Sequence, residues 1–276
     1  MGSLEALEVY WSSPGALTAL MAHTVLLIVL GVTYQVTSGP RPRLHILYSV
    51  YAVDVSLWSF LASSTLLCVA LSDRLEYEIT GVKLATSVSV FGGLIIGALA
   101  GMVLTFSEAA QEAHMARLGV DRIRVTQRDD APTLVFSERP GLFAASSSLH
   151  GSVVILSQRL QQVLSPNELE AVIAHEVAHL ANKDSRRRLA STLLSKCMFF
   201  DPLSKFVDPA IHRQGEFLAD DMAASDPTKA RALASALETL GAVCYADHGG
   251  GKAPGLRSRQ VPLELRLRRL AGRYSG

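Results

Sequence analysis

The sequence predicts a chain of two parts: three membrane-spanning helices, then a mainly α-helical domain with a small β-sheet. Two observations support this fold class. The first 107 residues contain three long windows that are almost free of charged side chains. Each window holds the span of about 20 apolar residues that crosses a bilayer as a helix. The remaining residues are more polar and change from short β-branched segments to longer helical ones. We therefore expect a transmembrane region over residues 1–107 and a separate domain over residues 108–276.

The expected membrane spans cover residues 16–36, 46–71 and 84–106. The flank before the first span carries Glu5 and Glu8 but no basic residue, unlike a signal peptide. Arg41 and Arg43 lie in the first loop, and several arginines follow residue 106. Basic residues favour the cytoplasmic side, so we expect a multi-pass protein of the cell membrane with its C-terminal domain in the cytoplasm. Asp54, inside the second span, is a functional candidate because ionisable groups are rare there.

The elements of the polar domain follow from local signals. Residues 121–127, 133–137 and 152–158 are short and β-branched and predict strands. The segment Ser-Pro-Asn-Glu at 165–168 is a capping box that begins a helix ending near residue 183. Asp-Pro pairs at 208–209 and 226–227 begin two further helices, and a short one forms around 263–270. Residues 189–207 predict a helix and a proline turn lying on the core or the membrane surface, with a fourth membrane span as the alternative.

The stretch 171-AVIAHEVAHLANKD-184 carries the clearest chemical signal of the sequence. His175 and His179 are four residues apart, so a helix places both imidazoles on one face, within reach of one metal ion. Glu176 then projects to the side of that ion. A catalytic zinc site usually takes three protein ligands and leaves the fourth position to water. A third ligand is therefore required, since otherwise the helix only carries two hydrogen-bonded histidines.

The segment 216-EFLAD-220 offers that ligand on the helix predicted to begin at residue 208. Glu216 would bind the metal. Asp220, one turn later on the same face, would accept a hydrogen bond from the outer nitrogen of a ligand imidazole, for which we choose His175. Carboxylates are common on surface helices, so this segment predicts a site only in combination with the histidines. Together they predict one zinc ion on His175, His179 and Glu216.

These motifs resemble the gluzincin zinc metalloproteases, in particular the membrane-bound HtpX-like peptidases. That family carries H-E-x-x-H followed by E-[FY]-x-A-D. The segment SPNELEAVIAHE, Asp184 and the closing VPLELRLRRL also match, so the resemblance covers roughly residues 126–270. Two departures are clear. Gly215 stands where the family often has arginine, and HtpX has two membrane spans after the histidine motif, whereas this chain has at most one.

The resemblance implies hydrolysis of peptide bonds, with Glu176 as the general base that takes a proton from the attacking water. A donor should stabilise the oxyanion, and His212 and Arg266 are the candidates we retain among several. A substrate peptide would add as a strand to the sheet edge. We expect that edge at 153–157, with Val153, Val154 and Ile155 as the contacting residues.

The leading hypothesis is a membrane-anchored zinc endopeptidase that acts on membrane proteins or cytoplasm-facing protein substrates. One alternative is a sensor protease of the BlaR type that cleaves a specific cytoplasmic regulator. Another is an inactive zinc-binding scaffold, against which Glu176 argues, because a structural site needs no base. The expected partners are protein or peptide substrates and the lipid bilayer. The net charge of +1 gives no nucleic-acid signal, and the oligomeric state stays open.

Overall fold

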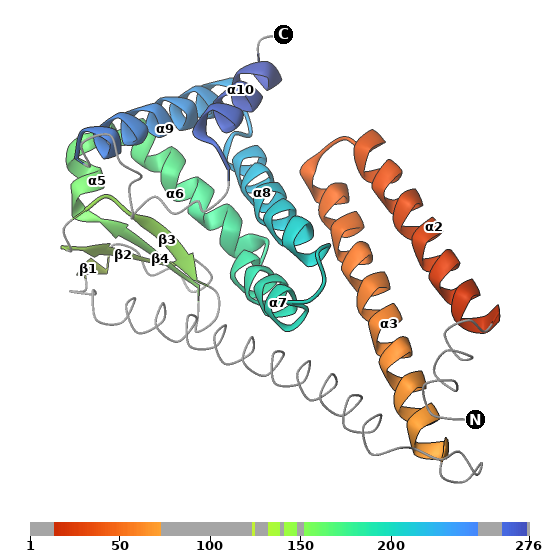
Figure 1. Ribbon diagram of the computed structural model, residues 1–276. Helices are drawn as coiled ribbons and strands as arrows, with labels where there is room; N and C mark the ends of the chain where they lie inside the picture. The colour runs from red at the N-terminus through yellow and green to blue at the C-terminus, as the bar shows by residue number, and fades with distance from the viewer. Residues whose placement is uncertain are drawn as a thin grey trace. The chain divides into compact units, whose positions relative to one another are not determined.

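The computed structural model describes residues 14–72, 123–124, 132–138, 141–147, 152–247 and 261–274 (Figure 1). The chain forms two compact units. One comprises Met1–Val103 with Ser195–Val207, and the other Leu104–Leu194 with Asp208–Gly276. The second unit contains the sheet and both predicted motifs. The boundary expected at residues 107 and 108 stays a prediction.

The first unit is built on two long helices, α2 (Pro14–Val36) and α3 (Pro40–Ser72), which pack against each other. The expected spans 16–36 and 46–71 fall on these helices, whereas 84–106 lies outside the described residues. In the part of the chain that the structure describes, no helix combines the length and apolar character needed to cross a membrane. Membrane crossing therefore stays a prediction. Asp54 is buried, with Oδ1 3.4 Å from Nε2 of His23.

The segment Ser195–Val207 belongs to this helical unit although its neighbours in sequence belong to the other. The hydroxyl of Tyr51 on α3 donates to the carbonyl of Ser204 over 3.3 Å. The rings of Trp58 and Phe200 meet edge to face with their centroids 5.1 Å apart. The expected helix followed by a proline turn is present, since α7 (Asp184–Cys197) precedes Pro202 and α8 (Ser204–Ala223) follows it.

The second unit contains a four-stranded sheet in the order β1-β2-β4-β3. Its strands are β1 (Ile123–Arg124), β2 (Thr133–Ser137), β3 (Ala144–Ser147) and β4 (Val153–Ser157). β4 pairs in parallel with β2 and antiparallel with β3. The sequence analysis missed β3, because its Ala-Ala-Ser-Ser sequence lacks β-branched residues.

The expectation that Val153, Val154 and Ile155 form a free sheet edge is wrong. β4 is bonded on both sides, so the outer strands among the described residues are β1 and β3. The run VVIL is uninterrupted and apolar, and Leu156 is fully buried. Such a run suits a strand covered on both faces rather than an edge.

Helices cover the sheet and carry the motifs. α5 (Gln158–Val163) leads into α6 (Pro166–Ala181), which begins with the predicted capping box: Ser165 accepts from the amide of Glu168, and Glu168 accepts from that of Ser165. α8 begins four residues earlier than predicted, because the carboxylate of Asp201 accepts from the amide of Ser204 over 2.8 Å and caps it. Pro209 therefore lies inside α8.

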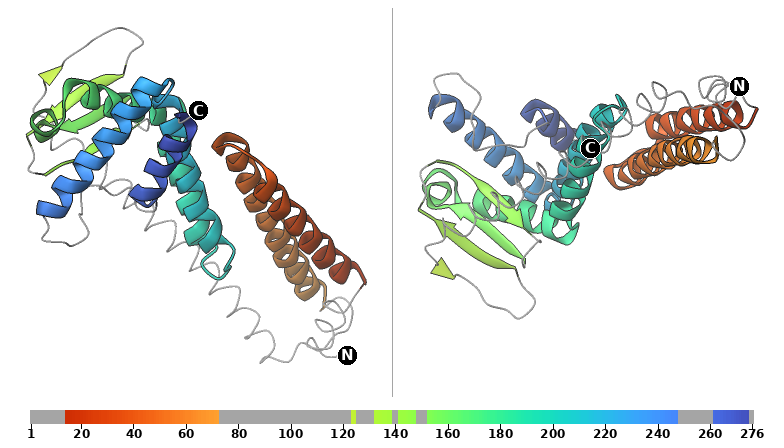
Figure 2. Two further views of the ribbon diagram at one scale, coloured as in Figure 1. Left: turned by 90° about the horizontal axis from the view of Figure 1, so that it is seen from above. Right: turned by 60° about the horizontal axis from the view of Figure 1, so that its bottom comes forward.

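The core of this unit lies between the sheet, α6 and α9 (Pro227–Asp247), and α6 runs beside the sheet (Figures 1 and 2). Leu156 from β4, Val172 from α6 and Leu240 from α9 belong to one buried cluster. The last helix, α10 (Leu263–Tyr274), packs on α9. This packing buries one face of α6, while α8 and α10 approach another part of that helix.

Candidate metal centre and active site

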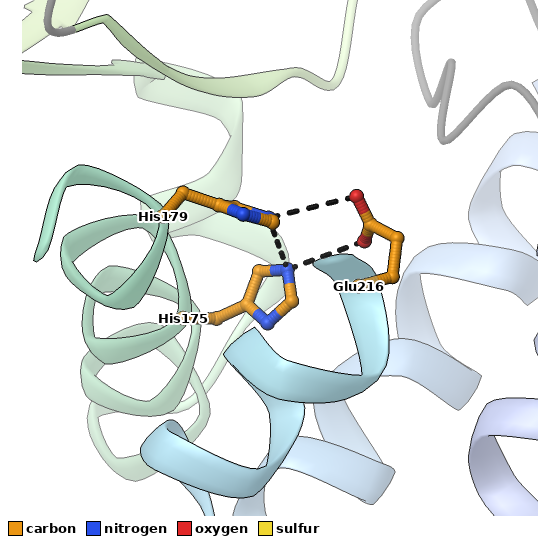
Figure 3. Close-up of side chains that lie close together, drawn as sticks. All are labelled: His175, His179 and Glu216. Carbon is orange, nitrogen blue, oxygen red and sulfur yellow. Dashed lines mark hydrogen bonds and ion pairs between the residues drawn. The ribbon is translucent and has the colours of Figure 1, made fainter. Parts of the chain in front are cut away.

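Three predicted ligands lie together where α6 faces α8 (Figure 3). Nε2 of His175 is 3.1 Å from Nε2 of His179. The carboxylate of Glu216 places Oε2 3.5 Å from Nε2 of His175 and Oε1 3.6 Å from Nε2 of His179. All three side chains are buried. The helical spacing at 175 and 179 supplies two of the three groups, and the packing of α8 on α6 supplies the third.

The spacing of these atoms fits a small metal ion. A tetrahedral ion with ligand bonds of 2.0–2.1 Å separates its ligand atoms by about 3.3 Å. The observed separations of 3.1, 3.5 and 3.6 Å bracket that value. Two imidazole nitrogens and one carboxylate oxygen are also a donor set that zinc accepts in catalytic sites. The residues present therefore fit the metal that the motif implies.

A carboxylate lies behind each imidazole and fixes which ring nitrogen carries a proton. Nδ1 of His179 is 2.7 Å from Oδ2 of Asp184, within hydrogen-bond range. Nδ1 of His175 is 3.1 Å from Oδ1 of Asp220, although that contact is not aligned as a hydrogen bond. Because a carboxylate accepts, both protons belong on Nδ1 and both Nε2 lone pairs face each other. Two such lone pairs at 3.1 Å repel unless a proton or a metal ion lies between them.

The electrostatics of the group favour a cation in the same place. Burial alone would lower the pKa of His175, but the carboxylates of Asp220 and Glu216 outweigh it and raise that pKa to about 9. Burial alone would raise the pKa of Glu216, yet its contacts with the two imidazoles and with Arg188 hold that pKa well below its usual value. Positive charge is therefore stabilised here, whether as a proton on His175 or as a metal ion.

The charged side chains around the group favour the binding of a cation. Four buried carboxylates surround it, those of Glu176, Asp184, Glu216 and Asp220. The guanidinium groups of Arg188 and Arg266 contact Glu216, and Nη1 of Arg187 lies 3.9 Å from Oδ1 of Asp184. Negative charge therefore exceeds positive charge by one among these residues, and a bound cation would offset it, which matters because uncompensated charge is costly in a buried site.

The two oxyanion candidates differ in their surroundings. Arg266 on α10 donates through Nε and Nη2 to both oxygens of Asp220, at 2.9 and 2.5 Å, and its Nη1 lies 3.4 Å from Oε2 of Glu216. Burial alone would lower the pKa of Arg266, but the Asp220 carboxylate raises it. His212 instead pairs with Asp208 over 3.4 Å and does not belong to the three-residue group.

Two residues at this site had no assigned role in the sequence analysis. Asp184 was noted only as a family match, yet it contacts His179. Arg188 belongs to a run of three arginines on α7, and its Nη2 donates to Oε1 of Glu216. Asp184 could have been found from its place directly after the histidine helix. Nothing in the local sequence pairs Arg188 with a carboxylate 28 residues later.

Comparison with known proteins agrees with this site. Residues 109–234 match the family described as Peptidase family M48. A relative from Gemmatimonas aurantiaca, named as a protease HtpX homolog, is 26% identical over 227 residues, which cover 68% of this chain and 80% of the relative. The chain contains an M48-type metallopeptidase domain that is similar to the HtpX proteases.

Other HtpX-like relatives match in the same way. A protease HtpX homolog from Thermococcus sibiricus is 26% identical and covers 58% of this chain and 77% of the relative. One from Archaeoglobus fulgidus is 30% identical over 108 residues, covering 39% and 32%. Among solved structures, S. mikatae Ste24p matches with a TM-score of 0.41 and 13% identity, over 90% of this chain and 80% of that one. This last likeness is too distant to establish a common fold.

Proposed function

We propose that this metallopeptidase is a membrane-anchored, zinc-dependent endopeptidase that cleaves membrane proteins or protein segments exposed to the cytoplasm. One observation carries the proposal: His175, His179 and Glu216 present three ligand atoms at the spacing of a tetrahedral ion, with Glu176 beside them. A binding scaffold would need the ligands alone.

Zinc is the metal that we propose because the donor set is two imidazoles and one carboxylate, without the additional oxygen ligands that magnesium or calcium requires. When bound, zinc would supply Lewis acidity to a water molecule and to the scissile carbonyl. His175, His179 and Glu216 would hold it, while Asp184 and Asp220 keep the imidazoles in the tautomer that offers Nε2.

Glu176 has the position of a general base. It directly follows His175 on α6, is buried, and does not belong to the three-residue group. Its carboxylate would accept the proton of the attacking water and then deliver it to the nitrogen of the leaving amine. Arg266 lies near enough to Glu176 for the two opposite charges to interact, and the Glu176 carboxylate is among the groups that raise the pKa of Arg266.

We place substrate binding on the outer edge of β3. This strand packs against α6, the helix that carries the two histidines, and it pairs with β4 along its inner edge. A peptide that adds to this edge would pair through its main chain, which gives affinity with little sequence selectivity. Such binding suits a peptidase whose substrates share exposed, extended segments rather than one sequence.

The proposed anchoring rests on the apolar N-terminal windows and on the outer surface of α2. That helix exposes a series of large apolar side chains with no protein cover among the described residues, including Met21, Ile28 and Val36. Such surfaces mark contact with lipid or another protein. Arg41 and Arg43 support a cytoplasmic position for the adjoining loop, and the arginines after residue 106 support the same side for the peptidase unit.

The deciding experiment compares wild type with Glu176→Gln, both purified in detergent, for bound zinc and for cleavage of casein. We expect zinc in both proteins and cleavage by wild type alone, because the substitution removes the base and spares the ligands. Zinc without cleavage in wild type would argue against a general endopeptidase. Extraction of native membranes with alkaline carbonate tests the anchoring separately, since an anchored chain stays in the pellet.

A further inference from the structure

Hydrolysis requires a donor for the carbonyl oxygen, which gains negative charge as water attacks. Arg266 is poorly suited, because Nε and Nη2 already bind Asp220 and only 7% of its side chain is exposed. His212 pairs with Asp208 away from the three-residue group. These two candidates therefore leave the donor unassigned, and another hydrogen-bond donor at the site is required.

Arg188 differs from Arg266 in the exposure of its side chain and in the number of its nitrogens that are already hydrogen-bonded. It lies on α7, and 35% of its side chain is exposed although its Nη2 reaches Oε1 of the buried Glu216. Among the described residues, no hydrogen bond engages its Nε or Nη1. A guanidinium with one nitrogen at a ligand carboxylate and further donors free can bind a second oxygen without losing the first contact.

The beginning of α7 also lies beside the proposed substrate edge. The hydroxyl of Ser185 donates to the carbonyl of Ser146 on β3 over 3.4 Å. Asp184 in the same turn contacts His179, and Arg188 follows one turn later on the face of Asp184. Residues in the first turns of α7 thus contact the outer strand β3, the ligand histidine His179 and the ligand glutamate Glu216. A peptide paired with β3 would pass close to Arg188.

We propose that Arg188 is a catalytic residue that donates a hydrogen bond to the scissile carbonyl oxygen as the tetrahedral state forms. This role rests on the proposed endopeptidase function. The water oxygen bonds to the carbonyl carbon, the π pair moves to the carbonyl oxygen, and the water proton goes to Glu176. The carbon–nitrogen bond then breaks as that proton reaches the amine, which yields one carboxylic acid and one amine. Arg188 keeps its charge throughout.

The test uses full-length wild type, Arg188→Gln, Arg188→Lys and the control Arg186→Gln, in detergent with saturating zinc. Arg186 is exposed on the same helix, and none of the described residues pairs with it. We expect Arg188→Gln to lower kcat for a fluorogenic peptide by about 100- to 1,000-fold, as loss of an oxyanion donor does in other hydrolases. KM and bound zinc should change little. Arg188→Lys should restore part of kcat, and the control should match wild type.

Three results would overturn the role. A loss of kcat in Arg188→Gln that occurs at limiting zinc and is absent at saturating zinc would show that Arg188 only holds Glu216 in place for the metal. A rise in KM at unchanged kcat would make it a ground-state binding residue. Full activity of Arg188→Gln beside an active wild type would remove Arg188 from the reaction and leave the proposed function intact, whereas an inactive wild type would remove both.

Discussion

His175 and His179 hold their Nε2 atoms 3.1 Å apart, and a carboxylate lies behind each ring. When His175 and His179 direct their Nδ1–H groups toward Asp220 and Asp184, the facing Nε2 atoms both present lone pairs. Two facing lone pairs are unfavourable, and either a proton on His175 or a metal ion between the two rings and Glu216 removes that repulsion. Zinc binding at this site depends on the two facing Nε2 atoms and on the carboxylates behind the rings.

Glu216→Gln should abolish tight metal binding. The substitution keeps the shape of the side chain but removes the negative charge that both imidazoles face, and the amide is a poor ligand. The loss should exceed the roughly 100-fold that removal of an outer hydrogen-bond partner costs. Competition with a zinc-binding dye measures it. Unchanged affinity would mean that another residue supplies the third ligand, and Asp221→Asn, on the same helix but paired with Arg269, serves as the control.

Asp184→Asn should weaken zinc binding by about 10- to 100-fold without abolishing it. The asparagine side chain can still accept a hydrogen bond from Nδ1 of His179, and the residue can still occupy the first position of α7. It holds the imidazole less firmly in the required tautomer. The same dye competition applies, and kcat at saturating zinc should recover most of its wild-type value. If kcat stays low when zinc is saturating, Asp184 also has a part in the chemistry.

Removal of the metal should destabilise the folded chain. Four buried carboxylates face three guanidinium groups, so chelation leaves an excess of negative charge inside the site. A ligand present at 100 times its Kd stabilises the folded state by about 2.7 kcal/mol. Tm should therefore fall on addition of a chelator and recover when zinc is added back. Glu176→Gln should show a similar shift, because it retains the ligands, whereas Glu216→Gln should show almost none.

Glu168→Ala should lower the free energy of unfolding by about 1 kcal/mol, the typical value of a lost helix cap. Glu168 accepts from the amide of Ser165 and from the hydroxyl of Ser235, which ties the start of α6 to α9. The exposed Glu170 on the same helix provides the control, Glu170→Ala. Denaturation of the detergent-solubilised chain measures the difference.

The effect of Glu168→Ala should also depend on pH. The hydrogen bonds from Ser235 and Ser165 lower the pKa of Glu168 below its usual value of 4.5. A lowered carboxyl pKa contributes stability that is fully present above the unfolded value and is lost as the pH falls through the folded value. The difference between wild type and Glu168→Ala should therefore be largest near neutral pH and shrink below pH 4.5. A difference that is constant across this range would show that the carboxylate charge is irrelevant.

Local sequence patterns predicted most of the helices and the helix faces on which the proposed metal ligands lie. The interval from His175 to His179 is one helical turn, and the interval from Glu216 to Asp220 is another, so each pair shares a face whatever surrounds it. The capping box at Ser165 and Glu168 is equally local, and it forms as predicted. The windows 16–36 and 46–71 fall on helices, as expected from their long apolar runs, while membrane crossing depends on surroundings that the local sequence does not describe.

Only the tertiary structure decided which side chains meet across elements. It placed Val153–Ser157 between two strands, brought Arg188 on α7 to Glu216 on α8, and bound Arg266 to Asp220. The physical reason is that sequence periodicity specifies the face of an element but neither its rotation against a neighbour nor the order of strands. Those are set by packing between segments far apart in the chain, such as Leu156, Val172 and Leu240 in the common core.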